Sequence, residues 1–316
     1  MGKLFTAIVP CYNEEDNIKP FYEKFIQNEE FFIHNQINFE LIYIDDGSKD
    51  ETAERVRELN KKDIRVRLIS FSRNFGKEAA MYCGLQHAKG EYVAIMDCDL
   101  QDPPDLLPQM FIWISKGYDQ VATRRVTRDG EPIIRSWFAR RFYSIMNKLS
   151  DTEIVDGARD FRLMTRKVVD NILKISEYNR FSKGIFSWVG FNTKWIEYEN
   201  IERVKGTSKW NFWSLFRYAI EGIVGYTVKP LELPFIIGGI IDIFSVVTII
   251  IVLILRFCCK FTGVFVSSTF IMILFVLLLF GVQMLVNGIF GEYLAKTYLE
   301  VKDRPIYIID EDTNKE

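Results

Sequence analysis

An acidic run from Asp97 to Pro104 holds the residues whose types and spacing best suit chemistry. Asp97 and Asp99 stand two residues apart, directly after an apolar stretch, 92–96, with the pattern of a buried strand. Mg²⁺ and Mn²⁺ prefer oxygen ligands, and Mg²⁺ usually binds one or two protein carboxylates while phosphate oxygens and water fill its other positions. The pair therefore suits a divalent cation that carries a diphosphate. The alternative is that the run is a solvated acidic turn, which ends at Pro103 and Pro104.

The elements that must position this run follow from an alternation of short apolar stretches with helical ones. Strands are expected at 6–10, 39–44, 66–71, 92–96 and 120–122, and helices at 17–27, 49–60, 77–88 and 104–115. Such an alternation predicts an α/β fold, a mostly parallel Rossmann-like sheet with helices on both faces. Ligands of these sheets bind beyond the carboxyl ends of the strands.

Polar clusters stand at four of these expected strand ends. They occupy residues 11–15, 45–48, 72–77 and 97–99. The carboxyl ends of parallel strands meet at one edge of a sheet, so the four clusters are expected to share one rim. Together they favour a nucleoside-diphosphate site much more strongly than the acidic run does alone.

Composition narrows the class of partner. The chain has 316 residues with 40 basic and 42 acidic side chains. This nearly balanced charge gives no electrostatic reason to expect nucleic-acid binding. Its five cysteines show no metal-binding spacing and are expected to be free thiols in a reducing compartment.

Two long apolar segments, 233–257 and 264–290, predict a C-terminal hairpin of transmembrane helices. Each exceeds the roughly 20 residues that a helix needs to cross a bilayer. Basic residues flank the pair more heavily than they occupy its turn, which predicts a multi-pass protein of the inner, cytoplasmic membrane with the catalytic domain and both termini in the cytoplasm. The alternative is a buried helix pair in a soluble protein.

This pattern divides the chain into four parts. Residues 1–205 form the catalytic domain, 206–232 an aromatic interfacial segment in contact with membrane lipid, 233–290 the two spanning helices and 291–316 a cytoplasmic tail. Small residues in the apolar segments leave room for a homo-oligomer through helix association; they are Gly238, Gly239, Gly281 and Gly288.

The motifs, taken in order, resemble family 2 glycosyltransferases, the inverting enzymes with a GT-A fold. The matching stretches are Val-Pro-Cys-Tyr-Asn-Glu-Glu at 9–15, Asp-Asp-Gly-Ser-Lys-Asp at 45–50, Arg-Asn-Phe-Gly-Lys-Glu at 73–78, Asp-Cys-Asp-Leu-Gln-Asp-Pro-Pro at 97–104 and Asp-Phe-Arg-Leu-Met at 160–164. With Arg180-Phe181, the stretch 205–210 and the apolar hairpin, nearly the whole chain is similar to the polyprenyl-phosphate glycosyltransferases, the group of bactoprenol glucosyltransferase and dolichol-phosphate mannose synthase.

The resemblance implies roles for individual residues. The nucleoside would be held by Pro10, Tyr12, Glu14, Ile44 and Asp46. Mg²⁺ or Mn²⁺ would be bound by Asp97, Asp99 and Gln101. Arg203 and Lys209 would neutralise the diphosphate, and Arg124 is a further candidate for phosphate contact. Asp99, Asp160 and Arg203 would be the catalytic residues, with Asp160 orienting the sugar, fixing Arg162 or acting as a base.

The implied reaction is a metal-dependent, inverting transfer of one sugar from a UDP-sugar to polyprenyl phosphate, such as undecaprenyl phosphate, for cell-envelope glycosylation. Glucose or N-acetylglucosamine is the favoured sugar. A phosphate acceptor is already anionic near neutral pH, so it needs no base to become a nucleophile. The alternatives are a processive polysaccharide synthase, against which the absence of a Gln-x-x-Arg-Trp motif argues, and a non-enzymatic nucleotide-sensing membrane module.

Overall fold

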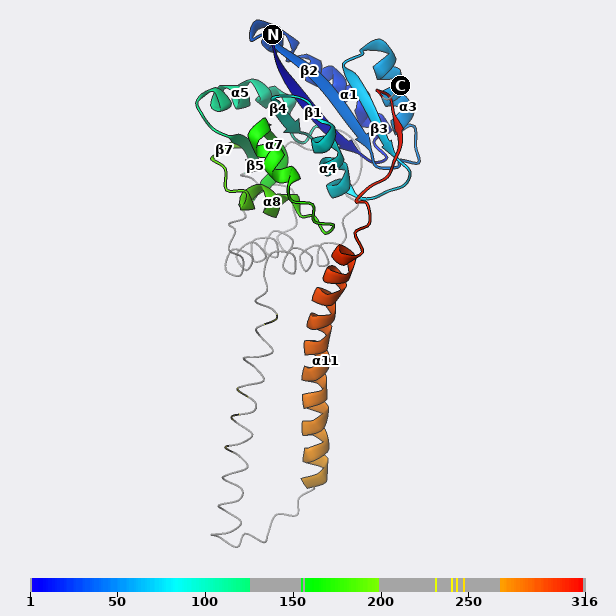
Figure 1. Ribbon diagram of the computed structural model, residues 1–316, viewed down its shortest axis with the longest axis vertical. Coiled ribbons are helices and arrows are strands. Elements are labelled where there is room, and N and C mark those ends of the chain that lie inside the picture. Colours follow the sequence, from blue (N-terminus) through cyan, green and yellow to red (C-terminus); the bar gives the residue numbers. More distant parts are fainter. Residues whose placement is uncertain are drawn as a thin grey trace.

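A computed structural model describes residues 2–125, 155, 157–198, 231, 240, 243, 247 and 268–314 of the chain. Its strands are β1 (Lys3–Cys11), β2 (Ile37–Asp45), β3 (Val66–Phe71), β4 (Tyr92–Ile95), β5 (Gln120–Arg125), β6 (Ala158–Thr165), β7 (Thr193–Tyr198) and β8 (Ile309–Asp312). They form one sheet in the order β7-β5-β6-β4-β1-β2-β3-β8 (Figure 1). The helices are α1 (Glu15–Ile26), α2 (Glu29–His34), α3 (Thr52–Lys62), α4 (Lys77–His87), the short η1 (Pro104–Leu106), α5 (Leu107–Ser115), α7 (Arg166–Leu173), α8 (Ser182–Trp188) and α11 (Ser268–Val301).

Four parallel strands form the half of the sheet that the sequence predicts. β1 pairs with β2 and with β4, and β2 pairs with β3, all in parallel. Pro10 lies opposite Ile44 and Cys11 opposite Asp45, so β1 and β2 end level with each other. The polar clusters that follow these strands therefore share one rim, and the expected Rossmann-like α/β architecture is confirmed.

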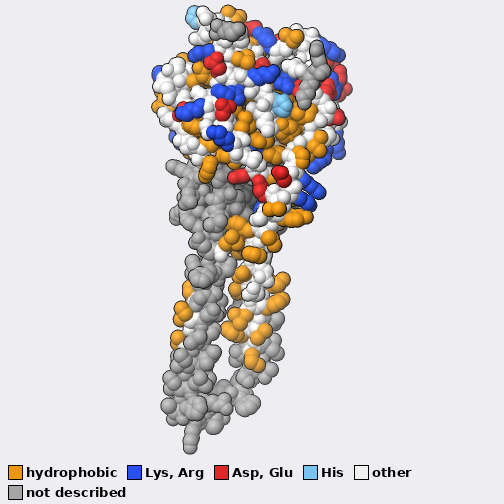
Figure 2. Space-filling view, viewed as in Figure 1, with side chains coloured by type: hydrophobic (Ala, Val, Ile, Leu, Met, Phe, Trp, Pro, Cys, Tyr) orange, Lys and Arg blue, Asp and Glu red, His pale blue; other side chains and the backbone are white. Residues whose placement is uncertain are grey.

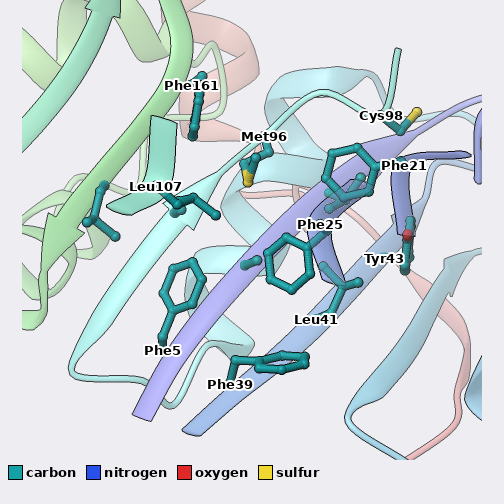
Figure 3. Packing of buried hydrophobic residues seen from close by; sticks show 14 of the residues in the cluster. Phe5, Phe21, Phe25, Phe39, Leu41, Tyr43, Met96, Cys98, Leu107 and Phe161 are labelled. Carbon is teal, nitrogen blue, oxygen red and sulfur yellow. The ribbon is translucent and has the colours of Figure 1, made fainter. Parts of the chain in front are cut away.

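Helices cover both faces of the sheet, because alternate strand residues point to opposite sides. On one face Phe5 and Val9 of β1 pack with residues of α1, α2, α3 and α5. The Phe5 ring meets the Phe111 ring edge-on at a centroid distance of 5.2 Å, and the surrounding aromatic cluster is seen in Figure 3. On the other face Ile8 packs with residues of α4, α7 and α8.

The other half of the sheet is mixed, which the sequence patterns do not predict. β6 runs antiparallel to both β4 and β5, and β7 runs parallel to β5. Asp160 lies on β6. Because β6 pairs with β4, the strand that precedes the acidic run, Asp160 is brought to the same rim as Asp97.

The last strand, β8, pairs antiparallel with β3 at the edge of the sheet. Arg67 on β3 donates to Asp312 at 2.9 and 2.7 Å, and both side chains are almost fully buried. Tyr307 stacks on Phe71 with a centroid distance of 5.0 Å. The chain therefore returns, after α11, to the sheet in which it started (Figure 1).

α11 extends away from the catalytic domain and exposes apolar side chains, seen in Figure 2 as orange patches along its length. The exposed large apolar residues of this helix include Met272, Phe275, Phe280, Met284 and Phe290. Its C-terminal end contacts the domain, where Lys296 donates to the Asn179 side chain at 3.2 Å and Glu300 accepts the backbone N–H of Tyr178 at 3.0 Å.

The localisation predicted from the apolar segments is corrected by the structure. In the described part of the chain, no helix combines the length and the apolar character that crossing a bilayer requires. The prediction of a multi-pass inner-membrane protein with both termini in the cytoplasm is therefore wrong. It rested on the length of the apolar segments and on the basic residues that flank them, whereas the helix that begins in the second segment continues through Glu292, Lys296 and Glu300 to the α/β domain.

Several predictions fall on residues outside the described ranges. These are Arg203, Lys209, the interfacial segment 206–232 apart from Leu231, and the first apolar segment 233–257 apart from Ile240, Ile243 and Val247. The domain boundaries and the helix association stay predictions.

Candidate active site

The rim begins with the loop that follows β2. Asp46 is buried, and its carboxylate accepts the backbone N–H of Phe75 at 2.6 Å and that of Gly76 at 2.9 Å. Burial raises the pKa of Asp46 to about 6, and the two N–H donors only partly oppose that rise. The carboxylate predicted to hold the nucleoside therefore also holds the loop between β3 and α4.

Two glycines allow this loop to come so close. Gly47 has a φ of +66°, and a Cβ there would lie 2.4 Å from the backbone carbon of Arg73. Gly76 has a φ of +98° and directly precedes α4. Both positions favour glycine because they need a left-handed backbone. The outcome is that Lys77, the first residue of α4, projects along the rim.

Lys77 bridges two carboxylates that come from distant parts of the chain. Its ammonium nitrogen lies 2.7 Å from Oδ1 of Asp97 and 2.6 Å from Oδ2 of Asp160. Burial by itself would raise the pKa of Asp160, but the charges of Lys77, Lys183 and Arg162 more than offset it and hold that pKa well below its usual range. Burial likewise works to lower the pKa of Lys77, and Asp160 and Asp97 reverse this and raise it. Asp160 and the ammonium of Lys77 are therefore both charged at neutral pH.

The rest of the acidic run forms a turn stiffened by a buried ion pair. Asp99 is 8% exposed and accepts the backbone N–H of Gln101 at 3.1 Å. Asp102 is fully buried and accepts Nε of Arg159 at 3.0 Å and the hydroxyl of Tyr198. Burial raises the pKa of Asp102, while Arg159 acts in the opposite direction. Asp97, which precedes this turn, pairs with Lys77 at the rim.

The residues predicted to hold the nucleoside are brought together at the ends of β1 and β2. Pro10 and Ile44 lie side by side in the sheet and are buried. Tyr12 is partly exposed in the turn after β1. Glu14 donates its backbone N–H to the Thr52 hydroxyl at 2.8 Å, which ties this turn to the start of α3. Their predicted contacts with a nucleoside stay predictions.

Arg124 and Cys98 both make contacts that give them a structural role. Arg124 on β5 forms an ion pair with Glu197 of β7, and both side chains are well exposed. Cys98, between the two carboxylates, is buried in the hydrophobic core, and burial raises the pKa of its thiol well above the usual value. Cys98 is therefore a packing residue.

The side chains at the rim fit a divalent cation of the kind that takes few protein ligands. The described residues contain no group of three or more His, Cys, Asp or Glu side chains arranged to hold a metal. Asp97 offers a carboxylate and Gln101 an amide oxygen that also accepts from the Arg159 guanidinium at 3.4 Å, and both are the hard donors that Mg²⁺ and Mn²⁺ prefer. Such an ion would need phosphate oxygens or water to complete its shell.

Sequence reasoning overlooked Lys77, Arg159 and Tyr198. Lys77 stands within the quoted motif at 73–78, and its position directly after Gly76 at a strand-to-helix turn was the signal available. Arg159 and Tyr198 carry no local signal, since their partner Asp102 lies 57 and 96 residues away in the chain.

Known proteins resemble this chain over nearly its full length. The glycosyltransferase CsbB of Bacillus subtilis (strain 168) is 44% identical over 308 residues, which cover 98% of this chain and 92% of that protein. The prophage-derived SfII bactoprenol glucosyl transferase of Shigella flexneri is 39% identical over 306 residues, which cover 96% of each. A prophage bactoprenol glucosyl transferase homolog of Escherichia coli (strain K12) is 38% identical, with 96% and 97% covered.

Among solved structures, the mannosyltransferase PcManGT from Pyrobaculum calidifontis aligns over 96% of this chain and 88% of its own, with 16% identity and a TM-score of 0.46. That similarity is weak, and the family assignment rests on sequence. The family model described as Glycosyl transferase family 2 matches residues 6–173, from β1 to the end of α7. With this match and with relatives at 38–44% identity, the chain belongs to glycosyltransferase family 2 and is a glycosyltransferase.

Proposed function

We propose that the enzyme transfers one sugar from a UDP-sugar to a polyprenyl phosphate, with inversion at the anomeric carbon. Two of the relatives above are named bactoprenol glucosyl transferase or its homolog, which supports a polyprenyl phosphate as acceptor and glucose as the first sugar to test. N-acetylglucosamine is the second.

The observation that carries the proposal is the contact of the Asp160 carboxylate with the ammonium of Lys77. A hydroxyl acceptor needs a general base whose pKa lies near the working pH. Lys77, 2.6 Å from Asp160, helps to hold the pKa of this carboxyl well below its usual range, which makes it a weak base. A phosphate acceptor is already anionic and needs no base, so the charge state of Asp160 matches a phosphate acceptor.

The reaction then proceeds in a single displacement. A phosphate oxygen of the acceptor attacks the anomeric carbon, the bond from that carbon to the diphosphate oxygen breaks, and the electron pair leaves with UDP. Asp160 orients the sugar hydroxyls by accepting their hydrogen bonds. Tyr12, Glu14 and Asp46 hold the nucleoside, while Arg203, Lys209 and Arg124 contact phosphate groups.

Asp97, Asp99 and Gln101 are the residues that would hold Mg²⁺ or Mn²⁺. When bound, the cation would stabilise the negative charge that gathers on the leaving diphosphate. Asp97 would contribute its half-buried carboxylate, and Asp99 keeps Gln101 in place by accepting its backbone N–H at 3.1 Å.

The test is a transfer assay with the purified full chain and a panel of radiolabelled nucleotide sugars. Undecaprenyl phosphate is the acceptor, and undecaprenol, which has a hydroxyl in place of the phosphate, is its matched control. We expect label from one UDP-sugar in the phosphate lipid, one sugar per lipid, the β anomer by NMR, and loss of activity with EDTA or in Asp97→Asn and Asp99→Ala. Equal labelling of undecaprenol, a polymeric product or no labelling with any donor would refute the proposal, and an Asp99→Ala variant at the wild-type rate would refute the metal assignment.

A further inference from the structure

Lys77 occupies a position that ordinary helix energetics does not favour. It is the first residue of α4, and the amino end of a helix carries a partial positive charge that disfavours a cation. Its ammonium forms ion pairs with two carboxylates outside the helix, Asp97 at 2.7 Å and Asp160 at 2.6 Å. The lysine thus depends on the two rim carboxylates, and they depend on it.

The backbone that carries Lys77 is held from two sides. Asp46 accepts the N–H groups of Phe75 and Gly76 immediately before it. Further along α4, Gly84 touches β1 so closely that a Cβ there would lie 2.2 Å from Cγ2 of Ile8. The start of α4 is therefore fixed relative to the sheet, and the ammonium is limited to what its own side-chain torsions allow.

The carboxylates at this rim already have protein counter-ions. Lys183 and Arg162 act on Asp160 in addition to Lys77, and Arg159 acts on both Asp102 and Asp97. A divalent cation that enters alone would add two positive charges to this balanced group and would compete with the ammonium for Asp97. A nucleoside diphosphate that enters with the cation brings the negative charge that restores the balance.

We propose that Lys77 holds the cation position between Asp97 and Asp160 in the donor-free enzyme, so that a divalent cation binds tightly only together with a nucleoside diphosphate. This inference rests on the metal dependence in the proposed function. It assigns to Lys77 the role of a built-in competitor that makes metal and donor binding cooperative. Once displaced from Asp97, the ammonium is free to turn towards the incoming phosphates.

The experiment is isothermal titration of the full chain with MnCl₂, with and without saturating UDP, each corrected by a protein-free blank. In the wild type we expect UDP to tighten Mn²⁺ binding at least about tenfold, and Mn²⁺ to tighten UDP binding by the same factor, because coupling between two ligands is reciprocal. In Lys77→Gln we expect donor-free Mn²⁺ binding at least about tenfold tighter than in the wild type, with a smaller coupling factor. Lys77→Met, with a different uncharged side chain, should behave in the same way.

Two controls keep the test specific. Lys167→Gln removes a lysine whose ion pair with Asp119 lies on the surface, and it should match the wild type. Lys77→Arg keeps the charge and should keep donor-dependent binding. If the uncharged variants bind Mn²⁺ as the wild type does in both states, the inference is overturned while the proposed function stands. If no form binds Mn²⁺ even with UDP and transfer continues in EDTA, the metal dependence fails, and the inference fails with it.

Discussion

The two ends of the rim hold their carboxylates in different ways. At the β2 end, Asp46 is satisfied by two backbone N–H groups, and its pKa is about 6. At the β4 and β6 end, Asp97 and Asp160 share the ammonium of Lys77, and the pKa of Asp160 is lowered despite burial. Both ends place an acid beyond the carboxyl end of a strand.

The difference shows what each kind of partner can do for a buried acid. Peptide dipoles leave part of the desolvation cost of Asp46 uncompensated, so it takes up a proton in mildly acidic solution. A full positive charge keeps Asp160 ionised and ready to meet a polar ligand. The first arrangement suits a carboxylate that holds a loop, and the second suits one that meets the substrate.

The largest effect is expected when a buried carboxylate loses the cation that pairs with it. Arg159→Met should lower the free energy of unfolding by about 3–5 kcal/mol, because Asp102 is fully buried and would lose its ionic partner. Urea denaturation measures the change. A loss below about 1 kcal/mol would mean that Asp102 is protonated in the native protein. The β4 end of the rim would then differ less from the β2 end in how it keeps its carboxylates ionised.

The dipole-held end makes a prediction that depends on pH. The pKa of Asp46 is raised from 3.8 to about 6, so the folded protein binds more protons than the unfolded chain between these values, and ionising Asp46 costs stability as pH rises through them. Asp46→Asn removes that cost. Relative to the wild type, its free energy of unfolding should rise between pH 4 and pH 7 by up to about 3 kcal/mol. A difference that does not change with pH would contradict the raised pKa.

The cation-held end makes a prediction about catalysis. Lys77→Gln should slow sugar transfer about 100-fold at pH 7, in line with removal of one charged group from a reaction centre. It should also raise the pKa of Asp160, since Lys77 opposes the effect of burial most strongly. The acid side of the pH–rate profile should therefore move to higher pH in this variant. An unchanged pH–rate profile would mean that the charge of Asp160 does not affect the rate of transfer.

The smallest effect is expected for an exposed pair of the same chemistry. Arg124 and Glu197 are 39% and 50% exposed, so Arg124→Met should change the free energy of unfolding by less than about 1 kcal/mol. The same urea series measures it beside Arg159→Met. If this variant keeps its stability but has a raised KM for donor or acceptor, the predicted phosphate contact of Arg124 gains support.

The sequence predicts best what depends on local pattern. The strand expected at 66–71 is β3, Val66–Phe71, and the other expected strands differ from β1, β2, β4 and β5 by a few residues at their ends. Their alternation with helices also places the four polar clusters on one rim. Hydrophobic periodicity and turn residues determine structure over a few neighbouring positions, so they can be recognised in a single sequence.

What the sequence does not show depends on pairing across long separations. β6 lies between β4 and β5, and β8 pairs with β3 from more than two hundred residues away. The sequence of neither β6 nor β8 contains a feature that identifies the strand with which it pairs. The same holds for Lys77, because a lysine at the start of a helix resembles a solvated residue until Asp97 and Asp160 are folded beside it. The long apolar segments led to a wrong prediction of localisation for a related reason. Apolar composition predicts that side chains are buried, but it does not show which surface buries them.

The return of β8 to β3 has a consequence for synthesis of the protein. While the ribosome is making α11, β1 to β7 are already outside it, and β3 presents an open strand edge with Arg67 lacking Asp312. That edge closes only when residues 309–312 emerge. Until then the nascent domain has a strand available for pairing with other chains, which is the interval in which a chaperone would have most to protect.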